Sequence, residues 1–137
     1  MELVKIPFAI RGDDRGSLVA VEGGRSIPFE IKRIYYIWGT SQGTVRGYHA
    51  HVTLKQVLIC VHGTCTIVLD DGEARTEVRL ADPAEGLYID SIMWREMKDF
   101  SEDAVLLVLA SEHYEESDYI RNYDEFVAMA NSGRRKD

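Results

Sequence analysis

The spacing of two histidines, a glutamine and two glycines constrains the fold of this 137-residue chain more than any other feature. Gly43 is followed after five residues by His49 and His51, and then by Gln56 and Gly63. Side chains alternate between the two faces of a β-strand, so histidines one residue apart point to the same side. The pattern therefore predicts a strand that carries both imidazoles into one interior.

Short apolar segments separated by turn residues predict an all-β protein. Glu30–Trp38 is expected to place Ile31, Arg33, Tyr35 and Ile37 on one face. Ala104–Ala110 is apolar throughout, as in a strand buried on both sides. The other expected strands are Ser17–Glu22, Arg46–His51, Gln56–Val61, Cys65–Leu69, Arg75–Leu80, Leu87–Ile89 and Met93–Met97.

Turn signals predict two hairpins and one helix. Gln56–Val61 and Cys65–Leu69 are expected to pair around His62-Gly63-Thr64. Asp70-Asp71-Gly72 carries the Asp-Gly signal of a second hairpin. A short helix over Tyr123–Ala130 is expected to end at Asn131-Ser132-Gly133, before a frayed tail at residues 134–137.

Composition limits the possible classes of function. Residues 1–137 are enough for one hydrophobic core but not for two, so one domain is expected. A net charge of −7 argues against binding to nucleic acid or an anionic membrane, and no segment is long enough to cross a bilayer. The N-terminus lacks a signal-peptide run, and Cys60 and Cys65 are expected to be free buried thiols. A cytoplasmic location is predicted.

The histidine spacing resembles the first signature of the cupin superfamily, whose histidines line a small β-barrel. In metal-binding cupins a glutamate stands where this chain has Gln56, and a third histidine comes from a later strand. The later segment here, Ile92–Met97, contains no histidine. The resemblance implies a cupin jelly-roll β-barrel with a short C-terminal helix. The changed ligand set predicts no metal, no cofactor, and two imidazoles free for proton transfer.

Nearly the whole chain resembles one cupin family, the WxcM-like dTDP-4-keto-6-deoxyglucose 3,4-ketoisomerases. The segments that carry this resemblance are Ser17–Glu22, Ile31–Ile37, Arg46–His51, Gln56–Cys60, Gly86–Ile89, Val108–Ser111 and Ser117–Tyr123. The resemblance implies a thymidine-diphosphate sugar bound in each barrel. It also implies a homodimer that exchanges N-terminal strands. The pathway implied is that of 3-amino-3,6-dideoxy sugars for bacterial surface polysaccharides, including O-antigen lipopolysaccharide and S-layer glycans.

The two histidines suit the chemistry of moving a ketone from C4 to C3 of a sugar. This reaction removes the C3 proton, forms an enediol and reprotonates C4. Histidine has an ordinary pKa of about 6.5, close to the pH at which such a base must work. We expect His49 to be the base at C3 and His51 to assist proton return or to polarise the oxygen. Ordinary core histidines are the alternative interpretation.

Cationic side chains are the candidates for substrate binding, because arginine forms paired bonds with phosphate oxygens. Arg33 shares a strand face with Tyr35, which could hydrogen-bond the sugar, although both could equally be ordinary strand residues. Arg46 and Arg121 lie within matched motifs. Two further candidates are Arg15 and Arg95, the latter where many relatives have histidine in a Trp-His-Glu-Met block. These two are expected to influence the C4 configuration of the product.

Three other interpretations of the sequence remain open. A metal-free epimerase acting on the same nucleotide sugar would leave the ketone at C4. A non-catalytic sugar-binding cupin would keep its function after His49→Asn. A metal-dependent cupin enzyme is disfavoured by the missing glutamate and third histidine.

Overall fold

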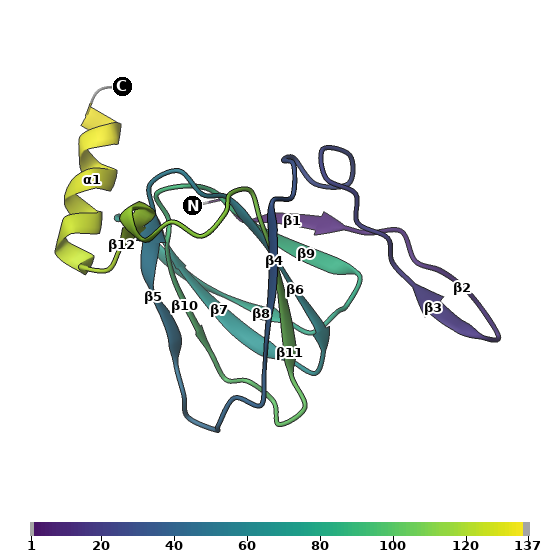
Figure 1. The fold of residues 1–137 in the computed structure, drawn as a ribbon. Helices are drawn as coiled ribbons and strands as arrows, with labels where there is room; N and C mark the ends of the chain where they lie inside the picture. The colour runs from purple at the N-terminus through teal and green to yellow at the C-terminus, as the bar shows by residue number, and fades with distance from the viewer. Residues whose placement is uncertain (1, 136–137) are drawn as a thin grey trace.

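Two five-stranded antiparallel sheets face each other in the computed structural model, which describes residues 2–135 (Figure 1). The first sheet has the strand order β1-β9-β6-β11-β4 and the second β12-β5-β10-β7-β8. The strands of the first sheet are β1 (Val4–Pro7), β9 (Glu85–Ile89), β6 (Gln56–His62), β11 (Val105–Ala110) and β4 (Arg33–Trp38). Those of the second are β12 (Tyr119–Ile120), β5 (Arg46–His51), β10 (Trp94–Lys98), β7 (Cys65–Asp70) and β8 (Arg75–Leu80).

Two further elements complete the chain. A 3-10 turn, η1 (Glu116–Asp118), leads into β12, and the helix α1 (Tyr123–Arg135) follows. None of the helices in the described residues has the length and apolar character needed to span a bilayer. The predicted all-β jelly roll with a C-terminal helix is confirmed.

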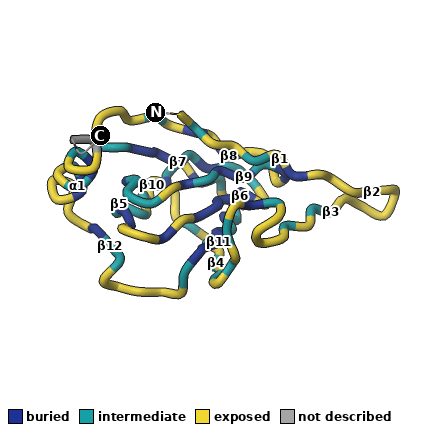
Figure 2. The backbone as a smooth tube through the Cα atoms, turned by 90° about the horizontal axis from the view of Figure 1, so that it is seen from above, coloured by how far each residue is buried: buried dark blue, intermediate teal, exposed yellow. Residues whose placement is uncertain are grey.

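The main core lies between the two sheets. Leu58, Ile67, Leu87, Leu106 and Val108 are completely buried there and belong to one apolar cluster. Figure 2 shows buried backbone concentrated along β6, β7 and β11, with exposed backbone at the periphery. The strand β11 pairs with β6 and β4, and four of its six residues are buried. Val105 and Leu107 are only partly buried, so the predicted burial on both sides is incomplete.

The prediction of a hairpin between β6 and β7 around Gly63 is wrong. The strand β6 pairs with β9 and β11, whereas β7 pairs with β8 and β10, so the chain crosses from one sheet to the other at this turn. Thr64 and Ser101 fix the crossover through two hydrogen bonds of 2.9 Å. The second predicted hairpin, between β7 and β8, is confirmed.

Two predicted boundaries also differ from the structure. The strand expected at Ser17–Glu22 stops at Leu18, because only β3 (Gly16–Leu18) has a partner, β2 (Arg11–Asp13). The helix α1 runs past Gly133 to Arg135, so the first two residues of the expected frayed tail are helical. Residues 136–137 lie outside the described residues. Cys60 and Cys65 are free and buried, as predicted.

A close contact between β5 and β10 determines how the barrel interior is arranged. Gly47 has a φ of +91°, and a Cβ atom there would lie 2.8 Å from the carbonyl oxygen of Arg95. Glycine is therefore required at this position. The β10 register shifts between Arg95 and Glu96, and Arg95 lies directly opposite His49. The bulge and the glycine together bring these two side chains to the same level of the barrel.

Candidate active site

Both predicted histidines project from β5 and lie against each other. The ring centroids of His49 and His51 are 4.8 Å apart, with an interplanar angle of 85°. His51 is 1% exposed, and His49 is partly buried. The Nδ1 atom of His49 lies 3.1 Å from the carbonyl oxygen of Gly47, which can accept its proton. In that tautomer Nε2 of His49 carries the basic lone pair.

Tyr119 covers both imidazoles. Its ring centroid lies 5.0 Å from that of His49 and 4.4 Å from that of His51. Tyr119 pairs with His51 in the β12–β5 register, so main-chain pairing determines where this ring packs. On its other side, the guanidinium of Arg121 lies 4.3 Å from the Tyr119 ring centroid.

Buried hydrogen bonds link Arg95 on β10 to Gln56 on β6 and Tyr35 on β4. Arg95 is completely buried and donates to the carbonyl oxygen of Met93 and to the side-chain oxygen of Gln56. Gln56 in turn donates from Nε2 to the Tyr35 hydroxyl, at 3.1 Å. Gln56 therefore orients Arg95 and Tyr35. Because Tyr35 accepts this bond, its own hydroxyl proton remains available for a ligand.

The charge of Arg95 has no anionic partner, because it makes no salt bridge within residues 2–135. Burial lowers the pKa of Arg95 to about 10, so the guanidinium is still protonated at neutral pH. Burial, followed by the positive charge of Arg95, lowers the pKa of His49 from 6.5 to about 4. The same two causes lower the pKa of His51 to about 2. Both rings are neutral in the ligand-free protein.

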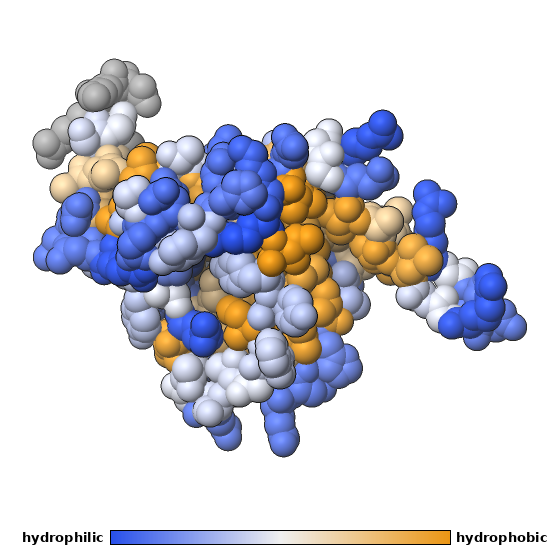
Figure 3. Space-filling model, viewed as in Figure 1, coloured by the Kyte–Doolittle hydropathy of each residue, from blue (hydrophilic) through white to orange (hydrophobic). Residues whose placement is uncertain are grey.

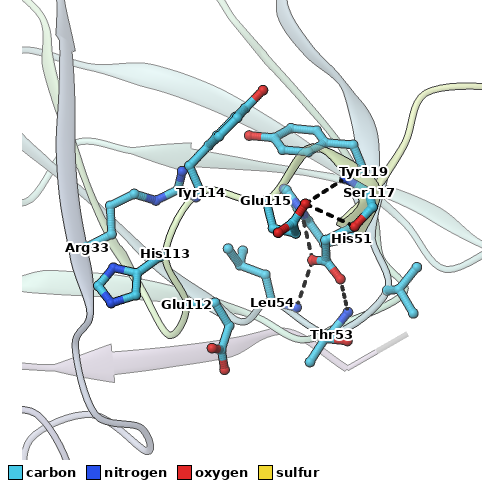
Figure 4. Close-up of a pocket in the computed structure, with 12 residues that line it drawn as sticks. Arg33, His51, Thr53, Leu54, Glu112, His113, Tyr114, Glu115, Ser117 and Tyr119 are labelled. Carbon is cyan, nitrogen blue, oxygen red and sulfur yellow. Dashed lines mark hydrogen bonds and ion pairs between the residues drawn. The ribbon is translucent and has the colours of Figure 1, made fainter.

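Two cavities meet at Tyr119 and Arg33, which line both. One, of about 450 Å³, is lined by His49 and by residues of β4, β5 and β10. The other, of about 550 Å³, is lined by His51 and by the segment from Glu112 to Tyr119. Figure 4 shows the second cavity, with His51 and Tyr119 on one side of the view and Arg33 on the other.

The structure brings most of the predicted binding residues together. Arg33, Tyr35, Arg46 and Arg121 all line the cavity of His49. The Nε atom of Arg33 is buried without a hydrogen-bond partner, and its guanidinium lies 5.4 Å from the Tyr35 ring centroid. Arg121 is exposed and bonded to Glu116 at 2.9 and 3.1 Å.

Arg15 is not part of this cavity. It lies at the tip of the β2–β3 hairpin, which projects away from the barrel (Figure 1). Its guanidinium is 87% exposed and forms an ion pair with Asp13 at 2.5 Å. The structure therefore does not support a role for Arg15 in the barrel of its own chain.

Sequence reasoning did not identify Tyr119 or Asp118 as site residues. Both lie in the Ser117–Tyr123 segment, from which only Arg121 was selected because of its charge. Tyr119 reaches the histidines because β12 pairs with β5. Pairing between strands so distant in sequence is not visible in the sequence itself.

Metal-ligating side chains do not cluster in the described part of the chain. No group of three or more histidine, cysteine, aspartate or glutamate side chains within residues 2–135 is placed to hold a metal ion. The side chain at the position of the cupin glutamate, Gln56, is instead engaged by Arg95 and Tyr35.

The geometry is that of a cupin barrel with an ionisable site at its mouth, and comparison with known proteins identifies the family. Residues 1–131 match the family model described as FdtA, WxcM-like, C-terminal. A TDP-4-oxo-6-deoxy-alpha-D-glucose-3,4-oxoisomerase from Aneurinibacillus thermoaerophilus is 54% identical over 126 residues, covering 92% of this chain and 91% of that protein.

Solved structures agree with this match. A 3,4-ketoisomerase from Helicobacter canadensis is 52% identical, with a TM-score of 0.92 over 96% of this chain and 98% of that one. A histidine-to-asparagine mutant of the 3,4-ketoisomerase QdtA from Thermoanaerobacterium thermosaccharolyticum, in complex with TDP-4-keto-6-deoxyglucose, is 47% identical. Its TM-score is 0.93, over 95% of this chain and 94% of that one. The chain belongs to the FdtA, WxcM-like family, as the sequence resemblance predicted.

The lowered histidine pKa values predict acid sensitivity. In the unfolded chain both rings bind protons below about pH 6.5, whereas in the folded protein they stay neutral to about pH 4 or lower. The unfolded state therefore binds more protons in this window, and the free energy of unfolding falls as the pH falls. By pH 5 the loss should be at most about 2 kcal/mol per ring.

Urea denaturation between pH 5 and 8 measures this dependence. The double variant His49→Asn/His51→Asn should show a shallower loss of stability, whereas His113→Asn, at an exposed position, should keep the wild-type slope. Equal slopes in the wild-type protein and the double variant would contradict the prediction.

Proposed function

We propose that this protein is a sugar 3,4-ketoisomerase that converts TDP-4-keto-6-deoxyglucose to its 3-keto isomer. The main support is a pair of neutral imidazoles on one strand, next to an arginine-lined cavity. The relatives named above are isomerases, which agrees with this proposal. Its place of action would be the cytoplasm. Its product would supply an aminotransferase that makes 3-amino-3,6-dideoxy sugars for surface polysaccharides.

The arginines support binding of a nucleotide diphosphate. The chain carries a net charge of −7, so a dianionic ligand needs a local cationic site. Arg33, Arg46 and Arg121 supply three guanidinium groups at the mouth of the His49 cavity. The unpartnered Nε of Arg33 is a donor that a phosphate oxygen could satisfy. Arg121 would exchange its contact with Glu116 for the ligand.

The proposed mechanism uses the two histidines in different roles. His49 takes the proton from C3, the C–H electrons form the C3–C4 double bond, and the carbonyl electrons move to O4. His51 takes the proton from the O3 hydroxyl and returns it to O4. His49 then gives its proton to C4 while the carbonyl forms at C3. Every proton removed is returned, so both rings end the cycle neutral.

Arg95 and Tyr35 would stabilise the negative charge that develops on the enediolate. The buried guanidinium is already oriented by Gln56 and Met93, and Tyr35 has a hydroxyl proton to donate. Donors fixed before the reaction cost no reorganisation when the charge appears, and the low-dielectric interior strengthens their effect. Met97 lines the same cavity and contributes an apolar wall.

Activity would be tested by incubating the purified protein with TDP-4-keto-6-deoxyglucose and a 3-aminotransferase and identifying the amino sugar by NMR. The wild-type protein should yield a 3-amino sugar. His49→Asn and His51→Asn should each reduce kcat about 10² to 10⁴-fold, the usual contribution of positioned acid–base groups. His62→Asn, at the exposed end of β6 and outside the lining of both cavities, is the matched control and should be fully active.

Incubation in D2O separates this proposal from the two remaining alternatives. An epimerase would incorporate deuterium next to a ketone that stays at C4. A non-catalytic cupin would bind the nucleotide sugar without any exchange. Either result would reject the ketoisomerase assignment.

A homodimer with exchanged N-terminal strands is also proposed. The β2–β3 hairpin projects from the barrel with Ile10 63% and Leu18 58% exposed. Ile34, Tyr36 and Trp38 on the edge strand β4 are 57–69% exposed. Figure 3 shows apolar atoms across the face that carries β4 and onto the base of the hairpin. A second copy that receives the hairpin would cover this surface.

Light scattering should give a mass about twice the 15.6 kDa of one chain. Trp38→Glu places a charge on the exposed face of β4, within the proposed interface, and should shift the protein towards monomer. A deletion of residues 11–18 should do the same if the hairpin is exchanged. A wild-type monomer at micromolar concentration would contradict the dimer.

Arg95 and Arg15 are proposed to determine the configuration at C4. Arg95 lies opposite His49, so its charge influences the face on which C4 receives the proton. Arg15 would act in the site of the second copy, because the hairpin that carries it projects away from the barrel of its own chain. Arg95→His should change the ratio of gluco to galacto product, as measured by NMR. An unchanged configuration in both Arg95→His and Arg15→Ala would reject this role.

A further inference from the structure

The second cavity holds a carboxylate against the more deeply buried histidine. The Oδ2 atom of Asp118 lies 3.4 Å from Nδ1 of His51, and the Asp118 side chain is 16% exposed. Figure 4 shows His51 on the wall of this cavity, close to Thr53 and Leu54. The proposed mechanism gives Asp118 no part, so its position next to a reacting ring requires an explanation.

Three consecutive main-chain amides hold Asp118 in place. Val52 donates to its carbonyl oxygen at 3.0 Å. Thr53 donates to Oδ1 at 2.9 Å, and Leu54 to Oδ2 at 3.1 Å. These amides follow directly after His51 in the chain. The turn that ends β5 therefore fixes the carboxylate relative to the ring.

The ring of His51 has no other hydrogen-bonding group to determine its protonation. Both of its nitrogens are buried and make no hydrogen bond within the described residues. A proton on Nδ1 would lie near the negatively charged Asp118 carboxylate, 3.4 Å from that nitrogen, and would be attracted to it. With the proton on Nε2 instead, the Nδ1 lone pair would face that oxygen, and two electron-rich groups would repel each other. The geometry therefore favours the Nδ1–H tautomer, with the basic lone pair on Nε2.

We infer that Asp118 is a positioning residue for His51, which it holds in the Nδ1–H tautomer and stabilises as an imidazolium when Nε2 takes up a proton. This inference rests on the proposed function for its catalytic consequence but not for the tautomer itself. When Nε2 accepts the proton of a substrate hydroxyl, the O–H electrons stay on oxygen. The proton is later returned from Nε2 to the other oxygen, so nothing else is consumed.

The other charges near the ring explain why a carboxylate is needed. Four groups, Arg95, His49, Arg33 and Arg121, lower the pKa of His51 through their charge. All of these are cations or become cations, so each disfavours a proton on His51. Asp118 supplies the opposite charge at short range. His49 differs, because its Nδ1 faces the neutral carbonyl oxygen of Gly47. One strand thus carries two imidazoles with different tendencies to hold a proton.

NMR of the wild-type protein tests the tautomer directly. Long-range ¹H–¹⁵N spectra distinguish a protonated Nδ1 from a protonated Nε2 in each histidine ring. His51 should appear as the Nδ1–H tautomer at pH 7, and Asp118→Asn should abolish this preference. An Nε2–H tautomer of His51 in the wild-type protein would overturn the inference, even if the variant did not fold.

Steady-state kinetics test the consequence for the reaction. Asp118→Asn should lower kcat about 10²-fold with little change in KM, since the orienting partner is lost while the substrate cavity remains. Loss of the carboxylate makes the imidazolium less stable, so the acidic limb of the kcat–pH profile should move to lower pH. An unchanged kcat and pH profile would refute the role of Asp118.

Two matched variants separate this role from structural support. Ser111→Ala removes the hydroxyl that accepts from the Lys55 amide at 2.9 Å. It therefore perturbs the chain next to the amides that hold Asp118 without removing any contact of Asp118 itself. Glu115→Gln neutralises another carboxylate of the same cavity. Both should keep the wild-type kcat and pH profile. If wild-type protein is inactive on TDP-4-keto-6-deoxyglucose, the proposed function fails, whereas the tautomer measurement still decides the role of Asp118.

Discussion

The buried guanidinium of Arg95 is the feature on which the rest of the site depends. Within the described residues it bonds to neutral oxygens only, from Met93 and Gln56, so its hydrogen bonds are satisfied while its charge has no opposite partner. Burying a charge without an opposite partner costs several kcal/mol of stability. The field of this charge contributes to keeping His49 and His51 neutral. The buried charge therefore lowers the stability of the fold, and it also makes the cavity electrostatically favourable for a negatively charged group.

Side chains on the outer face of β10 keep this arrangement in register. Neighbouring residues alternate across the strand, so Trp94 and Glu96 lie outside while Arg95 lies inside. Glu96 accepts from the Trp94 indole at 3.0 Å and from Arg75 at 3.2 Å. Tyr123, at the start of α1, packs edge-on against Trp94, with ring centroids 5.3 Å apart. The C-terminal helix therefore supports the strand that carries Arg95, although none of its described side chains lines either cavity.

Local patterns in the sequence predicted the parts of the fold that local rules control. Alternation placed Arg33 and Tyr35 on the inner face of β4, and the structure confirms this parity. It could not reveal that β6 and β7 belong to opposite sheets, because an apolar strand fits equally well in a hairpin or a crossover. Gln56 was recognised as unusual, but its partners, Tyr35 and Arg95, are distant in sequence. Such pairings depend on the closed barrel and are set by tertiary structure.

Negative charge in the cavity would raise the lowered pKa values of the two histidines. The cations Arg95, Arg33 and Arg121 all contribute to the depressed pKa of His51. A diphosphate bound as proposed would carry two negative charges into the region where Arg33 and Arg121 lie, so it would offset their field. The pKa of each ring would then rise towards the range in which a general base works best. Base strength would therefore depend on occupancy of the cavity. In the empty protein both rings stay uncharged, which limits the cost of burying them beside Arg95.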